Sequence, residues 1–431
     1  MKGRLAIHGG PRTVPEGLKK TWPEITQEDK EAVLAVLERG ILSGVHGPEA
    51  TSLEREWAEF TGSRYVLSFN SGTAALHAAL FAAGVGPGDE VITSAFSFSG
   101  SFHPILQQNA IPIFVDIDPR TYNLDVKKIE AKISDRTKVL MPVHIHGLPA
   151  DMDEILALAD KYHLIVIEDA CQAHGSTYKG KMAGTMGAMG CFSLNVTKNL
   201  SGGEGGFLNT ENEGYAERAR MIRTFGEKVL QEKEKIRPYY SYTIGWNYRT
   251  QELPAAFARS QLKRLPRYNA IAQRNGQYLT QELSKIPGLI PPYVPPDRTT
   301  IYHKYRFRFD PEALALKIPA AEFRNRLMET LEAEGVEITV WHVTPLTSFP
   351  IFQNLDEGYG KGCPWSCPYY GKEIRYVPED YPEAIRLLET SLVLNTESYP
   401  IYIQDLELME YYVQAFRKVF ENLDELLSGM S

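Results

Sequence analysis

Between residues 65 and 169, short apolar segments alternate with longer segments of helical character, and this alternation restricts the fold more than any other feature. The segments that predict strands are "YVLSF", "DEVITSAF", "IPIFVDID" and "LIVIEDA". Strands that alternate with helices predict an α/β fold, in which helices cover both faces of a mostly parallel sheet. Ligands bind such sheets at the carboxyl ends of the strands. We therefore expect functional residues at those ends.

The pattern changes after Leu253. The segment 253–286 predicts one long helix or two helices joined at Pro266, and the sequence beyond it predicts a smaller α+β unit. The stretch 349–382 is rich in proline and tyrosine and predicts mostly loop. Because 431 residues exceed what one hydrophobic core usually serves, we expect two domains. A large domain with an N-terminal arm would span residues 1–260, and a small C-terminal α+β domain would span residues 261–431.

The charge pattern excludes two classes of partner. The formal net charge is -8, and no long run of lysine or arginine offers a stripe for phosphates, which argues against nucleic acid. The sequence also has no polybasic segment for an anionic membrane, no apolar run of transmembrane length and no signal-like apolar region near its N-terminus. We therefore expect a cytoplasmic protein.

The four cysteines do not form a pattern with an obvious function. They are too few for a disulfide framework in so long a chain. Cys363 and Cys367, in "CPWSCP", have a spacing that occurs in metal sites, but no second pair of ligands accompanies them. We expect no metal.

Two ionisable residues stand at predicted strand ends. Lys198 lies between a short apolar run and a glycine-rich turn in "CFSLNVTKNLSGGEGGF", where it is either a surface lysine or a nucleophile. Asp169 ends the apolar strand of "VIEDACQAHG", where a carboxylate is unfavourable unless it is paired. It either caps the following turn or awaits a cationic ring nitrogen.

A third predicted strand end could bind phosphate. In "NSGTAAL", Gly72 and Thr73 lie where a strand passes into a helix, and the free N–H groups and dipole of a helix start attract anions. An ordinary helix cap by Ser71 or Thr73 is the alternative. Nearby, Phe98 in "SAFSFSG" offers an aromatic face. A pyridoxal phosphate enzyme requires a lysine, a carboxylate for the pyridine nitrogen and a helix start for the phosphate, and this chain supplies all three.

The sequence resembles the DegT/DnrJ/EryC1/StrS aminotransferases, which are fold-type I pyridoxal phosphate enzymes. The resemblance extends from "LAIHGG" to the C-terminal helix and implies a seven-stranded type of sheet in the large domain. Its most specific blocks are "NSGTAALHAAL", "GVGPGDEVIT", "PIFVDIDPRTYNLD", "VIEDACQAHG", "TKNLSGGEGG" and "GWNYRTQELPAA".

The resemblance implies a role for each matching residue. Lys198 would form the Schiff base with pyridoxal 5′-phosphate and carry protons, and Asp169 would face the pyridine nitrogen. The other cofactor contacts would surround the ring hydroxyl, the ring face and the phosphate, and they are Gln172, Phe98, Gly72, Thr73 and Ser193. Asn247, in "NYR", would reach the phosphate from the neighbouring subunit, which implies a homodimer with shared active sites.

The resemblance also implies the substrates. We expect an amino group to pass from L-glutamine or L-glutamate to a small polyhydroxylated ketone, either a keto cyclitol of the inosose type or a keto sugar. "LAIHGGPR" and the late "YPEAIRLLETSLVL" favour the cyclitol, in aminoglycoside-type or other secondary-metabolite biosynthesis. "TKNL" is more typical of enzymes for nucleotide-linked keto sugars, which is the alternative. His303, Tyr305 and His342 either border the substrate or belong to the core.

Two other classes of protein compete with this interpretation. A catalytically silent regulatory protein could bind the same cofactor, but the intact pair of Lys198 and Asp169 argues against it. An NAD-binding oxidoreductase would also alternate strands and helices. It requires a G-x-G-x-x-G sequence after the first strand, and this chain has none there.

Overall fold

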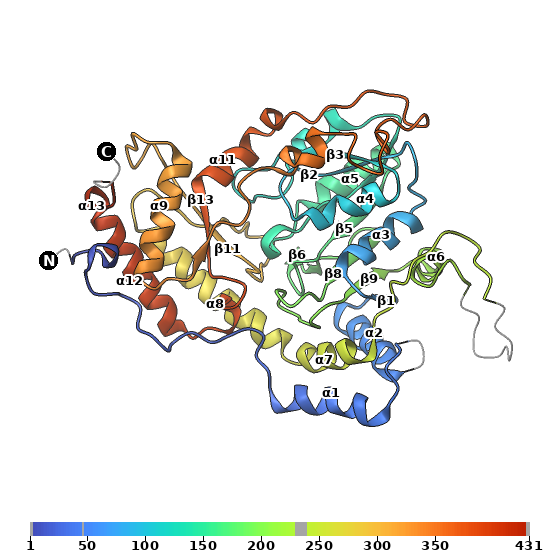
Figure 1. Cartoon of the computed structure of the whole chain (residues 1–431), viewed down its shortest axis with the longest axis horizontal. Helices are drawn as coiled ribbons and strands as arrows, with labels where there is room; N and C mark the ends of the chain where they lie inside the picture. Colours follow the sequence, from blue (N-terminus) through green and yellow to red (C-terminus); the bar gives the residue numbers. More distant parts are fainter. Residues whose placement is uncertain (1–2, 45–46, 229–238, 428–431) are drawn as a thin grey trace.

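The computed structural model of the chain describes residues 3–44, 47–228 and 239–427. Figure 1 shows helices and strands gathered around two separate sheets, a large one and a small one. The N-terminal segment runs along the helices of both regions and meets the C-terminal helices, where Asn422 Nδ2 donates a hydrogen bond of 3.4 Å to the carbonyl of Gly3.

The large sheet has seven strands in the order β1-β9-β8-β5-β4-β2-β3. These strands are β1 (Tyr65–Phe69), β2 (Glu90–Ser94), β3 (Ile111–Val115), β4 (Thr137–Leu140), β5 (Ile165–Asp169), β8 (Met189–Ser193) and β9 (Gly206–Thr210). Only β9 runs antiparallel to its neighbours, so the carboxyl ends of β1, β2, β5 and β8 meet at one edge. The prediction of a mostly parallel sheet is confirmed.

Helices cover both faces of this sheet (Figure 1). On one face, α3 and α6 bury alanine and leucine side chains against β1, β8 and β9. On the other face, Trp57 of α2 stacks on Phe207 with ring centroids 4.9 Å apart, and α5 covers β4 and β5. The helices of this region are α1 (Gln27–Arg39), α2 (Pro48–Thr61), α3 (Gly72–Ala82), α4 (His103–Gln107), α5 (Met152–Tyr162), α6 (Glu213–Arg223) and α7 (Glu252–Leu262).

The small sheet is antiparallel, with strands in the order β10-β11-β13-β12. Its strands are β10 (Leu289–Ile290), β11 (Tyr305–Phe309), β12 (Ile338–Thr339) and β13 (Ser391–Leu394). The accompanying helices are α8 (Leu265–Leu283), α9 (Ala320–Ala333), α11 (Pro382–Thr390), α12 (Leu406–Glu421) and α13 (Leu423–Leu427). The prediction of a smaller α+β unit is confirmed, whereas the domain boundary at residue 260 stays a prediction.

The question of one helix or two after Leu253 is answered by the break between α7 and α8. α7 ends at Leu262, and α8 begins at Leu265 with Pro266 in its first turn, where a missing N–H is tolerated. The segment 349–382 contains only α10 (Pro350–Gln353) and the 3₁₀ turn Pro378–Asp380 before α11, so the prediction of mostly loop is confirmed.

The remaining elements are short. β6 (Thr177–Tyr178) and β7 (Lys181–Met182) form a hairpin. The other 3₁₀ helices are Ala6–His8, Ser99–Ser101, Val126–Lys128, Glu130–Lys132, Ile145–Gly147, Leu346–Ser348 and Ile401–Ile403.

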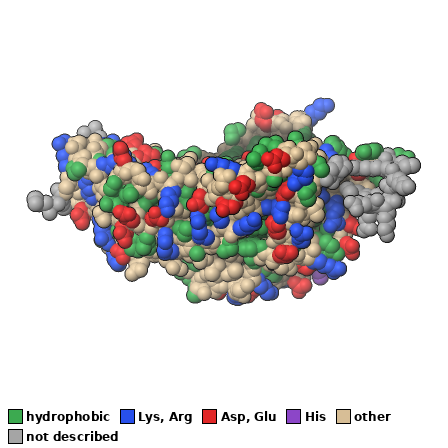
Figure 2. Space-filling view, turned by 90° about the horizontal axis from the view of Figure 1, so that it is seen from below, with side chains coloured by type: hydrophobic (Ala, Val, Ile, Leu, Met, Phe, Trp, Pro, Cys, Tyr) green, Lys and Arg blue, Asp and Glu red, His purple; other side chains and the backbone are tan. Residues whose placement is uncertain are grey.

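The described residues contain neither a membrane-spanning helix nor a metal-like cluster. None of their helices is both long and apolar enough to cross a bilayer. None of their histidine, cysteine and carboxylate side chains gather in threes around a point that could hold a metal ion, and Cys363 and Cys367 are free thiols. On the face seen in Figure 2, basic and acidic side chains are interspersed and no single-sign patch stands out.

Candidate active site

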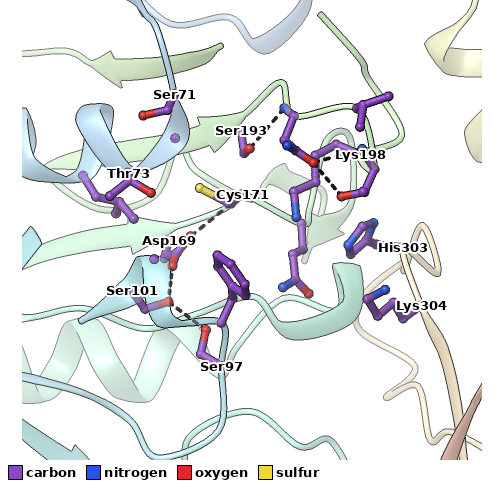
Figure 3. A pocket seen from close by; sticks show the side chains of 18 of the residues that line it. Ser71, Thr73, Ser97, Ser101, Asp169, Cys171, Ser193, Lys198, His303 and Lys304 are labelled. Carbon is purple, nitrogen blue, oxygen red and sulfur yellow. Dashed lines mark hydrogen bonds between the residues drawn. The ribbon is translucent and has the colours of Figure 1, made fainter. Parts of the chain in front are cut away.

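A cavity of about 620 Å³ opens where the carboxyl ends of β1, β2, β5 and β8 meet (Figure 3). The segments that follow these strands supply most of its wall, and residues from the small-sheet region close it. Of the residues singled out in the sequence, those that line this cavity are Gly72, Thr73, Phe98, Asp169, Gln172, Ser193, Lys198 and His303. Seven of these positions follow the strand ends of the large sheet as expected, and His303 reaches the cavity from the small-sheet region. Their functional roles stay predictions.

The start of α3 forms one end of the cavity. Ser71 caps the helix, because its Oγ accepts a hydrogen bond of 3.0 Å from the backbone N–H of Ala74. A Cβ atom on Gly72 would lie 2.8 Å from the Cβ of Ser193 and 2.9 Å from Cys171 Sγ, so only glycine fits. Thr73 Oγ1 has no hydrogen-bond partner among the described residues. This helix start therefore offers backbone N–H groups and a free hydroxyl to an anion.

Asp169 ends β5 and lies on the floor of the cavity, where it is almost fully buried. Its Oδ2 accepts a hydrogen bond of 2.6 Å from Ser101 Oγ, and its Oδ1 accepts one of 3.2 Å from the backbone N–H of Cys171. Both donors are neutral, so the negative charge of the carboxylate is oriented but not neutralised. A cationic ring nitrogen would supply the missing charge.

Lys198 lies in the turn between β8 and β9 and lines the same cavity. Burial lowers the pKa of its ammonium group, while the neighbouring Cys171 and Asp169 act in the opposite direction. Its Nζ has no hydrogen bond or ion pair within the described part of the chain. A partly enclosed amine with a lowered pKa is suited to act as a nucleophile.

Two residues on the cavity wall have groups left for a ligand. Phe98 is 55% exposed, so one side of its ring is uncovered. Gln172 is buried, and its Oε1 accepts a hydrogen bond of 2.7 Å from the backbone N–H of His146. Its amide nitrogen has no partner among the described residues and can donate to an oxygen in the cavity.

Two of the predicted substrate residues, Tyr305 and His342, do not line the cavity. Tyr305 is fully buried in the core of the small-sheet region, where its hydroxyl lies 3.0 Å from Thr280 Oγ1. Because β11 points this side chain into that core, direct contact with a substrate does not fit its position. His342 is not among the residues that line the cavity, and its ring centroid lies 6.4 Å from that of Phe98.

Asn247 does not line the cavity of its own chain. Its Oδ1 accepts a hydrogen bond of 2.9 Å from Arg249 Nε, and its carbonyl accepts one of 3.3 Å from Asn70 Nδ2. A role of this residue in the site of a neighbouring subunit stays a prediction.

The structure adds cavity residues that the sequence analysis missed. Ser101, Lys304, Trp341 and Glu397 line the wall, and the last three come from the small-sheet region. Lys304 stands directly before β11, a strand whose residues are all buried, so its side chain has to be accommodated in a buried position. The positions of Trp341 and Glu397 could not be predicted, because nothing in their local sequence places them near β5 or β8.

Comparison with known proteins agrees with this fold and cavity. The family model described as "DegT/DnrJ/EryC1/StrS aminotransferase family" matches residues 23–378. The spore coat polysaccharide biosynthesis protein SpsC of Bacillus subtilis is 36% identical over 88% of this chain and 91% of its own. L-glutamine:scyllo-inosose aminotransferase of Streptomyces griseus is 32% identical over 99% of this chain and 100% of its own. GDP-perosamine synthase of Caulobacter vibrioides is 34% identical over 77% of this chain and 86% of its own.

Solved structures share the whole architecture. An aminotransferase from Psychrobacter cryohalolentis superimposes with a TM-score of 0.81 at 30% identity, covering 94% of this chain and 100% of the other. NtdA from Bacillus subtilis, solved with bound cofactor PMP, superimposes with a TM-score of 0.75 at 27% identity, covering 95% of this chain and 86% of the other. The chain thus has the fold of proteins that carry a B6 cofactor.

Proposed function

Since the chain belongs to the DegT/DnrJ/EryC1/StrS aminotransferase family, whose members depend on pyridoxal phosphate, we propose that it aminates a keto cyclitol of the inosose type. The amino group would come from L-glutamine or L-glutamate. The observation that carries the proposal is the meeting of Lys198, Asp169 and the start of α3 around one cavity. These three features come from three different strand ends, and each matches a different part of the cofactor.

The residues of the cavity fit pyridoxal phosphate. The space that glycine leaves at position 72, together with the free hydroxyl of Thr73 and the hydroxyl of Ser193, would hold the phosphate. Asp169 would hold a proton on the pyridine nitrogen, and Gln172 would donate to the ring hydroxyl. The uncovered side of Phe98 would pack on the ring.

The chemistry then depends on where this chain places a base. Pyridoxal phosphate, when bound, supplies an aldehyde that captures the nitrogen of the substrate and a ring that accepts electrons from the reacting carbon. Lys198 Nζ would bind that aldehyde between turnovers and, after the substrate displaces it, accept and return the proton of the reacting carbon. The lowered pKa increases the neutral fraction of Lys198 at neutral pH, which favours both tasks.

The choice of a cyclitol rests on relatives that are named for inososes. One of them aligns over 99% of this chain and two others align over 78%, a share similar to the 77% of GDP-perosamine synthase. A nucleotide-linked keto sugar is the second candidate acceptor, because GDP-perosamine synthase is 34% identical to this chain in the part that aligns, and the relative named for scyllo-inosose is 32% identical. The route would belong to aminoglycoside-type or other secondary metabolism.

We also propose that the enzyme acts as a homodimer. The described chain leaves Asn247 outside its own cavity, and the partner subunit's Asn247 would then contact the phosphate. Tyr240, Tyr242 and Ile244, in the segment before Asn247, are exposed apolar side chains that an interface would cover.

A panel assay tests the proposed function. The full chain is loaded with pyridoxal phosphate and incubated with L-glutamine and either keto cyclitols or nucleotide-linked keto sugars, and amine formation is followed by mass spectrometry. We expect amination of a keto cyclitol.

A pair of lysine variants tests the role of Lys198. Lys198→Ala should abolish turnover and the visible absorbance of the enzyme-bound cofactor, whereas Lys317→Ala, at an exposed position, should change neither. Turnover by Lys198→Ala would contradict the assignment.

A further inference from the structure

A second lysine lines the cavity, and its charge is not balanced by a buried partner. Lys304 directly precedes β11, and its side chain is only 6% exposed. The nearest carboxylate is that of Glu397, whose Oε1 lies 3.7 Å from Lys304 Nζ. The Glu397 side chain is 59% exposed, so it can turn into solvent at little cost. Lys304 is thus a buried ammonium that has only a weak, displaceable counter-ion.

The neighbouring cation, Arg306, is bound on all sides. Its guanidinium donates to His146 Nε2 at 3.1 Å, to Ser391 Oγ at 2.5 Å and to the carbonyl of Trp341 at 2.7 Å. It does not line the main cavity. Arg306 therefore has a structural role, and Lys304 is the cation in this region that a ligand can reach.

The surroundings of Lys304 are those of a binding position. The ring of Trp341, which also lines the cavity, has its centroid 5.5 Å from Lys304 Nζ. Next to it, His303 is almost fully buried, and its Nδ1 has no hydrogen-bond partner among the described residues. Figure 3 shows His303 and Lys304 side by side on the wall of the cavity that also contains Lys198.

We propose that the ammonium group of Lys304 binds the α-carboxylate of the amino-acid donor, which replaces the carboxylate of Glu397. L-glutamine and L-glutamate both carry this group, and a carboxylate is the anion that a lysine in a partly apolar site recognises by charge. The keto cyclitol has no carboxylate, so Lys304 serves the donor half of the reaction only. This inference rests on the proposed aminotransferase function.

The test compares both halves of the reaction in Lys304→Met. Methionine has nearly the same length and keeps the contact with Trp341, and loss of a weakly paired buried charge should not destabilise the fold. We expect the KM for L-glutamine to rise about tenfold to a hundredfold, as for the loss of one charge-assisted hydrogen bond. The KM for the ketone should change less than about twofold.

Two further variants serve as controls. Lys304→Arg should restore part of the donor affinity. Lys372→Met, which breaks an exposed ion pair with Asp135, should behave like the unmodified enzyme.

Binding without chemistry provides a second readout. Glutaramate, which is L-glutamine without its amino group, is titrated calorimetrically into the cofactor-loaded enzyme and its variants. We expect Lys304→Met to lose measurable binding and Glu397→Gln to bind more tightly, because the competing carboxylate has been removed. The amide of γ-aminobutyric acid lacks the carboxylate, and Lys304→Met should use it as well as the unmodified enzyme does.

The outcomes separate this inference from the proposed function. If the unmodified enzyme aminates no ketone with either L-glutamine or L-glutamate, the proposed function fails. If it does, but Lys304→Met keeps the donor KM and the glutaramate affinity, or raises the ketone KM instead, then only the role of Lys304 is wrong.

Discussion

Ser101 Oγ donates a hydrogen bond of 2.6 Å to Asp169 Oδ2, and Ser97 Oγ lies 2.7 Å from Ser101 Oγ. The serines follow β2 and the carboxylate ends β5, so the hydrogen bond joins two segments of the large sheet at the floor of the cavity. It fixes the direction of the carboxylate without neutralising it. Asp169 is therefore oriented before any cofactor enters.

Ser101→Ala should reduce the rate more than it reduces cofactor affinity. The variant removes the donor to Asp169 Oδ2, which is worth about 1 kcal/mol and corresponds to a roughly fivefold to tenfold lower rate of the donor half-reaction. Stopped-flow absorbance of the bound cofactor measures that rate. Ser99→Ala is the control, because Ser99 is nearby but makes no contact with Asp169. Equal rates in both variants would contradict an orienting role of Ser101.

Gly72→Ala should weaken cofactor binding by tenfold or more. Its Cβ would lie within 2.9 Å of both Ser193 Cβ and Cys171 Sγ, so α3 or the end of β8 has to move at the phosphate end, at a cost of about 1–3 kcal/mol. A titration with pyridoxal phosphate, followed by absorbance, measures the dissociation constant. Gly86→Ala is the matched control, since a Cβ there meets nothing within 4 Å. Unchanged affinity of Gly72→Ala would show that the cofactor phosphate binds elsewhere.

The sequence predicted the large sheet and most of the cavity because both depend on local patterns. Strand ends such as Asp169 and helix starts such as Gly72 can be located from the alternation of apolar and polar segments, and parallel strands bring them to one edge. Lys304, Trp341 and Glu397 reach the same cavity from the small-sheet region, through long-range packing that no local pattern encodes. The sequence left open whether Tyr305 borders the substrate or belongs to the core. In the structure it lies in the core, because a strand turns successive side chains to opposite faces and the residue after Lys304 points away from the cavity.

The turn that carries Lys198 is held from outside the large sheet. Trp22 Nε1 donates a hydrogen bond of 2.5 Å to the carbonyl of Val196, and the Tyr402 hydroxyl donates one of 3.2 Å to the carbonyl of Thr197. The rings of Trp22 and Tyr402 pack edge to face with centroids 4.9 Å apart. The N-terminal segment and the small-sheet region therefore jointly set the position of the turn that carries Lys198.

Trp22→Phe should lower the turnover number about threefold to tenfold, because it removes one neutral hydrogen bond but keeps an aromatic ring. Both half-reactions should slow by the same factor, since both use Lys198. Trp365→Phe is the control, because it also removes an indole hydrogen bond, to the hydroxyl of Tyr376, in a core cluster that does not carry Lys198. Both variants should lose similar amounts of thermal stability. A kinetic effect shared by both variants would mean that general destabilisation, and not the position of Lys198, slows the enzyme.

The charge of Lys304 should make donor recognition depend on pH. Burial lowers the pKa of Lys304 from 10.5 to about 8; Glu397 counteracts this shift, and Lys198 and Arg306 add to it. Below about pH 8 the group is an ammonium and attracts a carboxylate, and above that pH it is neutral. The affinity for glutaramate, whose own charge does not change in this range, should therefore fall as the pH rises through about 8. Calorimetric titrations from pH 6.5 to about pH 9.5 measure the decline.

The free energy of unfolding should rise with pH over the range in which the affinity for glutaramate falls, because both depend on the charge of Lys304. The pKa of Lys304 in the folded chain lies below 10.5, so the buried charge costs stability in full below about pH 8, and this cost disappears as the pH approaches 10.5. Lys304→Met should therefore raise the Tm most at low pH and least near pH 10, as measured by differential scanning calorimetry. Lys304→Arg, which stays charged, should keep glutaramate affinity constant across this range. A decline in Lys304→Arg as steep as in the unmodified enzyme would assign the titration to another group in the cavity.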